Sequence, residues 1–444
     1  MPVAQNEVEV QHELLTRIAD ARTQTDRLFE IVKPEALYDR PIPERHRIVF
    51  YIGHLEAFDW NLLRERVLGL NTPHPDLDDL FAFGIDPVDG GLPADRPADW
   101  PAITDVRAYV TRTRESLDTA LREVVAGRRS VAQSEFDPTQ LLNVAIEHRL
   151  MHAETLAYMF HQLPLDRKTK ATSTPDISAP VFKPTMVEIP EGAATLGLSR
   201  DDGTFGWDNE YERNEQHVPS FAIDQYKVTN GDYLKFMQAG GYQDPTLWKE
   251  ADWQWKEQQN ISHPVFWKQV GDAWLYCTMF DEVPLPLNWP VYVSHAEANA
   301  YAHWAGKALP TEAQWHRAAY STPAGEERQY PWGSAAPNGA LGNFDFHRWE
   351  PTPVNSFPDG QSACGVRDLL GNGWEWTSTE FAPFPGFEPF SFYPGYSANF
   401  FDGKHYVIKG GSARTAACML RRSFRNWFQP HYQYVYAGFR CVSR

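Results

Sequence analysis

The chain contains few cysteines. Only four occur in 444 residues, namely Cys277, Cys364, Cys418 and Cys441, and no two of them form a CxxC pair. A disulfide framework therefore cannot organise the fold, and a thiolate zinc site is disfavoured. One disulfide or one reactive thiol remains open.

Long apolar runs and excess positive charge are also missing. No hydrophobic segment approaches the roughly twenty residues that a membrane-spanning helix needs. The first residues are polar and then amphipathic, unlike a signal peptide, so we expect a cytoplasmic protein. The formal net charge of -17 argues against nucleic acid or an anionic membrane surface as a partner. Small-molecule substrates stay possible because they respond to local charge.

Tryptophan, in contrast, is abundant, and nearly all of the 16 tryptophans follow residue 200. The two halves of the chain therefore differ in composition, and the length favours two or three domains. We predict a helical bundle over 1–165, a linker over 166–184 and an α+β domain with little regular structure over 185–444. Within the last region, helices are predicted at 294–305 and from Thr311 through Ala319.

The first region shows apolar residues at helical spacing. Helices are predicted at 7–32, 44–70, 104–126 and 138–162, and the Pro-, Asp- and Gly-rich segment 71–101 is predicted to be a long loop. Four helices of this length form a bundle, and the core-facing positions of bundles often carry metal sites.

Three histidines are candidates for such a site. His148 and His152 lie four residues apart on the apolar stripe of the fourth predicted helix, and imidazoles at this spacing can bind one metal ion. His54 is the third candidate, on a face of the second predicted helix shared with Tyr51 and Phe58. From spacing alone, a metal site and a pair of hydrogen-bonded core histidines fit the pattern equally well.

These histidines and several later motifs resemble a known family. His54 with His148-x-x-x-His152 is similar to the metal-binding pattern of the DinB-like bundle in ergothioneine sulfoxide synthases. The second half resembles an FGE-sulfatase (formylglycine-generating-enzyme) domain, which has a C-type-lectin-like fold. The matching segments are FGWDNE at 205–210, VTN at 228–230, LPTEAQW at 309–315, GNGWEW at 371–376, GGS at 410–412, RNW at 425–427 and AGFR at 437–440.

Formylglycine-generating enzymes themselves bind copper through a cysteine pair late in the chain. Here Cys441 follows Cys418 only after 23 residues, and a helical bundle precedes the second half. Both features favour the synthase over the oxidase.

The resemblance implies an enzyme with an Fe(2+) cofactor held by His54, His148 and His152. It implies that O2 is used to join cysteine or γ-glutamylcysteine to hercynine, which is N-α-trimethylhistidine, giving a sulfoxide in ergothioneine biosynthesis. Selenoneine synthesis, ovothiol-type synthesis and thiol dioxygenation on the same scaffold remain open. A lectin-like binding module is the non-enzymatic alternative.

Substrate contacts are implied by the segment around Trp427. Its ring can face the trimethylammonium group of hercynine, and Asn426 precedes it in the same motif. Phe428 stands where synthases that use γ-glutamylcysteine carry an aspartate, which favours free cysteine as the sulfur donor; core packing is the alternative. Met151 replaces a glutamine that contacts hercynine in that same subgroup.

Two tyrosines and two arginines complete the candidates. Tyr393 and Tyr396 flank a Pro-Gly turn similar to the family segment with a catalytic tyrosine, although such a turn is also typical of a surface loop. The cysteine-using subgroup carries its catalytic tyrosines in the long loop, which here, at 71–101, contains none. Arg422 and Arg425 can bind a substrate carboxylate. The alternative is that they form structural ion pairs within the domain.

Overall fold

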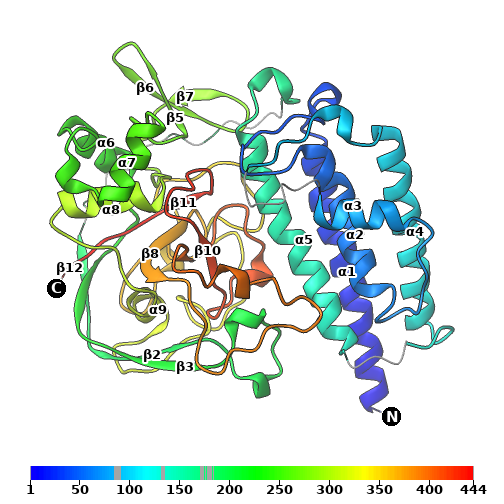
Figure 1. Cartoon of the computed structure of the whole chain (residues 1–444). Coiled ribbons are helices and arrows are strands. Elements are labelled where there is room, and N and C mark those ends of the chain that lie inside the picture. Colours follow the sequence, from blue (N-terminus) through cyan, green and yellow to red (C-terminus); the bar gives the residue numbers. More distant parts are fainter. Residues whose placement is uncertain are drawn as a thin grey trace. The chain divides into compact units, whose positions relative to one another are not determined.

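The computed structural model describes residues 2–84, 92–131, 136–170 and 185–443, together with residues 175, 177 and 183. The chain divides into two compact units, Met1–Ala171 and Thr172–Arg444. The first is helical, and the second combines short strands with short helices (Figure 1). The predicted class, multi-domain α and α+β, is confirmed.

The predicted linker, 166–184, falls mainly outside the described residues. Its first residues belong to the first unit, because Lys168 pairs with Val32 in an isolated antiparallel bridge. The predicted domain boundaries at 165 and 184 stay a prediction.

Among the described residues, the first unit consists of four long helices and one short helix. They are α1 (Pro2–Phe29), α2 (Ile48–Leu63), α3 (Pro75–Phe83), α4 (Ile103–Val125) and α5 (Pro138–His161). Helix α1 packs mainly on α5, and α2 packs on α3, α4 and α5. The second helix is shorter at both ends than the predicted 44–70. Within the part of the chain that the structure describes, no helix is long and apolar enough to cross a membrane.

The prediction of a continuous loop over 71–101 was wrong, because α3 forms inside it. Pro75 occupies the first turn of α3, where its missing N–H is not needed. Asp78 in the same turn accepts hydrogen bonds from Trp60 at 3.1 Å and Tyr109 at 2.7 Å. These contacts anchor α3 on α2 and α4. Residues 85–91 of the predicted loop lie outside those described.

The second unit is built from four small sheets. Their strands are β1 (Met186–Ile189), β2 (Gly192–Leu196), β3 (Asn214–Val218), β4 (Phe221–Asp224), β5 (Trp267–Val270), β6 (Ala273–Cys277), β7 (Glu282–Pro284), β8 (Trp374–Glu380), β9 (Tyr406–Lys409), β10 (Asn426–Phe428), β11 (Ala437–Gly438) and β12 (Val442–Ser443). The strand orders are β1-β4-β12, β10-β9-β8-β11, β2-β3 and β5-β6-β7. Such short strands fit the prediction of little regular structure.

Four short helices accompany these sheets: α6 (Asn230–Gln238), α7 (Glu250–Gln258), α8 (His295–Trp304) and α9 (Glu312–Tyr320). The last two match the predicted helices to within one residue at each end. Capping boxes start them at Ser294 and Thr311, whose side chains accept from backbone N–H groups of the first turn. Helices α6 and α7 were not predicted; each spans nine residues. Thr229, which caps α6, was the available signal.

The register of β10 determines how the RNW motif is presented. In the antiparallel β9–β10 pair, Trp427 lies opposite Val407 and Phe428 opposite Tyr406. Since successive side chains of a strand point to opposite faces, Trp427 and Phe428 face different surroundings. The helix α9 contributes Trp315, which is fully buried in the apolar core that also contains residues of β2 and β4.

Candidate functional site

Three histidines converge in the first unit. His54 comes from α2, and His148 and His152 come from successive turns of α5, as the apolar stripe predicts. One possible ligand atom from each ring lies within 4.8 Å of the others. The ring centroids are 4.5 to 5.3 Å apart. With metal–nitrogen bonds of about 2 Å, small rotations of the rings would let all three reach one ion.

Helix α3 orients one of these rings. The Nδ1 atom of His54 lies 2.7 Å from the backbone carbonyl oxygen of Phe81. A carbonyl only accepts, so Nδ1 carries the proton and donates it, which leaves the lone pair on Nε2 for a metal. This contact could not be predicted from the sequence because any residue at position 81 offers the same carbonyl. The start signals of α3 were the only clue.

Aromatic rings pack on the histidines. Phe58 stacks on His148 with centroids 3.4 Å apart, and Phe50 stacks on His54 at 4.7 Å. Burial lowers the pKa of His54 to about 4, although its backbone hydrogen bond acts in the opposite direction. Burial, and then a neighbouring histidine, lower the pKa of His148 and of His152 well below the usual range. All three imidazoles are therefore neutral near pH 7, the form that binds metals.

Two buried ring nitrogens are also unpartnered within the part of the chain that the structure describes. Nδ1 of His148 and Nδ1 of His152 are buried and make no hydrogen bond with the described residues. Leaving a buried polar atom unsatisfied costs about 1–3 kcal/mol, so such atoms are candidates for ligand contacts. Three neutral imidazoles suit iron, zinc, copper or nickel and leave coordination positions open. The residues present thus fit a non-haem metal.

An ion-pair network fixes α2 against α5 beside the histidines. Arg149, which follows His148, donates to Asp59 at 2.6 Å and pairs with Glu56 at 3.0 Å. All three side chains are buried. Burial would raise the pKa of Glu56, but Arg149 and two further arginines lower it to about 2. Because Glu56 and Asp59 belong to α2, the network holds His54 at a set distance from α5.

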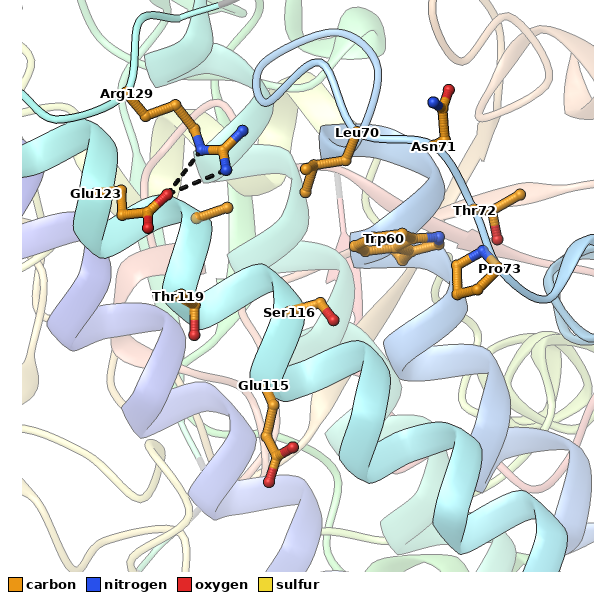
Figure 2. A pocket seen from close by; sticks show the side chains of 11 residues that line it. Trp60, Leu70, Asn71, Thr72, Pro73, Glu115, Ser116, Thr119, Glu123 and Arg129 are labelled. Carbon is orange, nitrogen blue, oxygen red and sulfur yellow. Dashed lines mark hydrogen bonds and ion pairs between the residues drawn. The ribbon is translucent and has the colours of Figure 1, made fainter.

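A separate pocket of about 620 Å³ opens between α2 and α4 (Figure 2). Figure 2 shows Trp60 and the Glu123–Arg129 ion pair among its lining residues. The others are Leu70, Asn71, Thr72, Pro73, Glu115, Ser116, Thr119 and Ala120. None of the three converging histidines lines it, so this pocket and the histidine cluster are different features.

In the second unit, Trp427 belongs to an aromatic cluster. Its ring stacks on Phe381, with centroids 4.1 Å apart and planes 7° apart. Tyr396 meets it edge-on at 5.5 Å. The side-chain oxygen of Asn426 accepts from the backbone N–H of Trp427 at 2.8 Å. Asn426 and Trp427 are both half-buried, so one ring face is supported by the protein.

The two residues that depart from the γ-glutamylcysteine pattern lie in different units. Phe428 is half-buried and stacks on Tyr432 with centroids 5.2 Å apart. Met151 is half-buried on α5, directly before His152. Their roles toward the sulfur donor and hercynine stay predictions.

Both candidate arginines are paired within the second unit. Arg425 is 2% exposed, lies 3.0 Å from Glu312 through Nε, and packs over the Phe384 ring at 4.0 Å. Arg422 is half-buried and donates to Glu327 at 3.0 Å. Structural ion pairs, the alternative left open by the sequence, are therefore present. Binding of a substrate carboxylate by either arginine stays a prediction.

The two candidate tyrosines lie close together. The ring centroids of Tyr393 and Tyr396 are 5.7 Å apart, and Tyr396 stacks on Trp207 at 4.0 Å. Burial raises the pKa of Tyr393, and the charge of Asp208 raises it further, so its phenol keeps its proton. Which tyrosine acts in catalysis stays a prediction.

Each of the two units matches the model of a known domain family. The first matches the DinB superfamily over residues 17–156, and the second matches the sulfatase-modifying factor enzyme 1-like domain over residues 176–444. A hercynine oxygenase of Mycobacterium tuberculosis is 40% identical over 56% of this chain and 58% of that protein. Ergothioneine biosynthesis protein 1 of Schizosaccharomyces pombe is 28% identical over 93% of this chain and 54% of that protein.

One relative matches from end to end. The hercynine oxygenase of Mycolicibacterium smegmatis is 32% identical over 97% of this chain and 98% of that protein. The same two domains occur in this chain in the order that the sequence motifs predict. The chain therefore belongs to the hercynine oxygenase family.

Proposed function

We propose that this protein is a non-haem iron(II), O2-dependent sulfoxide synthase of ergothioneine biosynthesis. It would form a C–S bond between cysteine and hercynine. The observation that carries the proposal is the cluster of three neutral histidines, two buried and one half-buried, in a chain similar over 97% of its length to a hercynine oxygenase. The names of the relatives support hercynine as one substrate and oxygen as another.

The proposed reaction balances without an external reductant. The imidazole C–H bond and the thiol S–H bond break, and a C–S bond and an S–O bond form. O2 accepts four electrons, two from C–S bond formation and two from oxidation of the sulfur. One oxygen atom enters the sulfoxide, and the other leaves as water with the two hydrogens.

The first unit would hold the metal through His54, His148 and His152. When bound there, iron(II) would supply redox chemistry toward O2 and a Lewis-acidic centre for the thiolate. The Phe81 carbonyl fixes the tautomer of His54, and Phe58 covers one face of His148. Holding the sulfur beside an unreactive imidazole carbon is a proximity effect, which rewards such rigid ligands.

The second unit would supply substrate contacts. We assign the trimethylammonium group of hercynine to Trp427, because a quaternary ammonium is attracted to an aromatic face and Phe381 supports the opposite face of this ring. Asn426 and Met151 are assigned to the same substrate. Arg422 is the better candidate for a carboxylate than Arg425, since Arg425 is more deeply buried.

Phe428 and the two tyrosines suggest the identity of the sulfur donor and of the proton donor. Phe428 cannot make a charge-assisted hydrogen bond to a γ-glutamyl group, so free cysteine is the expected donor. Tyr393 or Tyr396 would supply a proton or a hydrogen atom during oxygen chemistry. The high pKa of Tyr393 keeps its hydroxyl protonated and supports this role.

The decisive experiment is anaerobic reconstitution with Fe(II), followed by O2 and hercynine with either cysteine or γ-glutamylcysteine. Mass spectrometry should find an adduct equal to hercynine plus cysteine plus one oxygen atom minus two hydrogens. Cysteine sulfinate as the sole product would instead establish a thiol dioxygenase. Absence of both metal binding and O2 uptake would point to a binding module. His148→Ala serves as the matched inactive control.

A further inference from the structure

Asp208 is a buried carboxylate that the proposed chemistry does not use. It is 0% exposed and lies in a short 3-10 turn, Asp208–Glu210. Its Oδ1 atom accepts from the Ser397 hydroxyl at 2.6 Å. Its Oδ2 atom is buried and has no hydrogen-bond partner among the described residues. A carboxylate oxygen in such a position is costly, so its presence calls for an explanation.

The contacts of Asp208 lead to the two candidate tyrosines. Ser397 directly follows Tyr396, and Trp207, which precedes Asp208, stacks on the Tyr396 ring with planes 24° apart. The ring of Tyr396 in turn lies 5.7 Å from that of Tyr393. Asp208 and its neighbour Trp207 therefore hold the end of the segment that carries both tyrosines.

From this geometry we infer that Asp208 is a positioning residue for the hydroxyl group of Tyr393. The inference rests on the proposed function, in which Tyr393 or Tyr396 supplies a proton or hydrogen atom. Asp208 fixes the chain after Tyr393 through Ser397, and Trp207 stacks on Tyr396, whose ring packs near that of Tyr393. The charge of Asp208 also raises the pKa of Tyr393, so the hydroxyl keeps the proton that it must deliver.

The charges around Asp208 have partners of their own. Arg425 donates through Nη1 to the Asn209 carbonyl and pairs with Glu312 through Nε. Arg421 pairs with Glu210 at 2.5 Å. Burial raises the pKa of Asp208 itself, and the hydrogen bonds from Ser397 and the backbone lower it. Within the part of the chain that the structure describes, both arginines therefore pair with other carboxylates and not with Asp208, so the effect of removing its charge can be followed by titration.

The test places 3-fluorotyrosine at position 393 and follows its titration by fluorine NMR in the full-length protein. Asp208→Asn keeps the size of the side chain and removes the charge, so the pKa at position 393 should fall by roughly one unit. Ser397→Ala keeps the charge but loosens the segment, so it should broaden the fluorine signal without lowering the pKa. Asp359→Asn, an exposed carboxylate of the same unit, is the matched control and should change neither.

Turnover provides the second readout. Asp208→Asn should lower kcat about tenfold while the KM values for hercynine and cysteine and the iron content stay near those of the parent. An unchanged fluorine pKa together with an unchanged kcat would overturn the inference. If Asp208→Asn does not fold, Ser397→Ala decides, because an unbroadened signal with full kcat would overturn it equally. A fluorine shift without any sulfoxide product would instead contradict the proposed function and leave the positioning intact.

Discussion

The candidate site residues of the two units differ in their hydrogen bonding: among the described residues the histidines of the first unit keep unpartnered ring nitrogens, whereas the candidate arginines of the second unit are paired with carboxylates. In the first unit, ring nitrogens of His148 and His152 are buried without a hydrogen bond from the described residues. In the second unit, Arg440 donates to Glu375 at 2.5 and 2.9 Å, and Arg425 pairs with Glu312. Nitrogens left unsatisfied by the fold mark atoms for a ligand, whereas paired guanidinium groups mark structure.

The backbone explains this difference. Long helices satisfy their own N–H and C=O groups, so side chains of the first unit are available for a site. The irregular backbone of the second unit needs side chains as partners. Arg317, for example, donates to the backbone carbonyls of Pro190, Glu191 and Ala193 where the chain passes from β1 into β2. Asn372 bridges the Thr352 backbone and Asp368.

The strongest test of the comparison removes a histidine. His152→Ala should abolish stoichiometric iron and turnover, because two imidazoles remain where three are required. Stability without metal should change little, since its buried Nδ1 makes no hydrogen bond with the described residues. Metal analysis and thermal unfolding measure both effects. His303→Ala, an exposed histidine of the second unit, is the control, and full iron occupancy in His152→Ala would refute the site.

Breaking a pair in the second unit should produce the reverse result. Arg425→Met leaves Glu312 with only the more distant Lys409 at 3.9 Å, and loss of one partner of a buried pair costs about 3–5 kcal/mol. Urea unfolding should show this loss while iron binding persists. The double variant Arg425→Met with Glu312→Gln should recover part of it. Unchanged stability combined with a raised substrate KM would instead make Arg425 a substrate ligand.

The preference for one sulfur donor over another tests the role of Phe428 in β10. Free cysteine should exceed γ-glutamylcysteine in kcat/KM, because Phe428 offers no charge-assisted hydrogen bond. Such a bond is worth about 1.5–3 kcal/mol, or roughly ten- to a hundred-and-fifty-fold. Phe428→Asp should shift the ratio toward γ-glutamylcysteine, and Phe428→Leu should not. A parent enzyme that prefers γ-glutamylcysteine would contradict this assignment.

Trp427 is expected to give the smallest effect. A desolvated cation–π contact is worth about 2 kcal/mol, so Trp427→Ala should raise the hercynine KM on the order of thirtyfold. The cysteine KM and the iron content should hardly change, and Trp427→Phe should restore part of the affinity. Calorimetric melting is the check on folding. A large drop in melting temperature with an unchanged hercynine KM would make Trp427 a core residue only.

Much of the fold follows from local patterns in the sequence. The apolar stripe of α5 placed His148 and His152 on one face, and the cap residues Ser294 and Thr311 marked the starts of α8 and α9. Such signals act over one or two helical turns, so they can be recognised without the fold. The order of the family motifs then identified both domains.

Other features depended on residues far apart in the chain. The Phe81 carbonyl orients His54 across 27 positions, and Asp208 binds Ser397 across 189. The pairing of Arg425 with Glu312 likewise joins separate segments. A hydrogen bond or ion pair forms only where packing brings its two partners within about 3 Å, and spacing along the chain does not encode that distance. The sequence therefore determined which residues could act, and the tertiary structure decided which of them are already engaged.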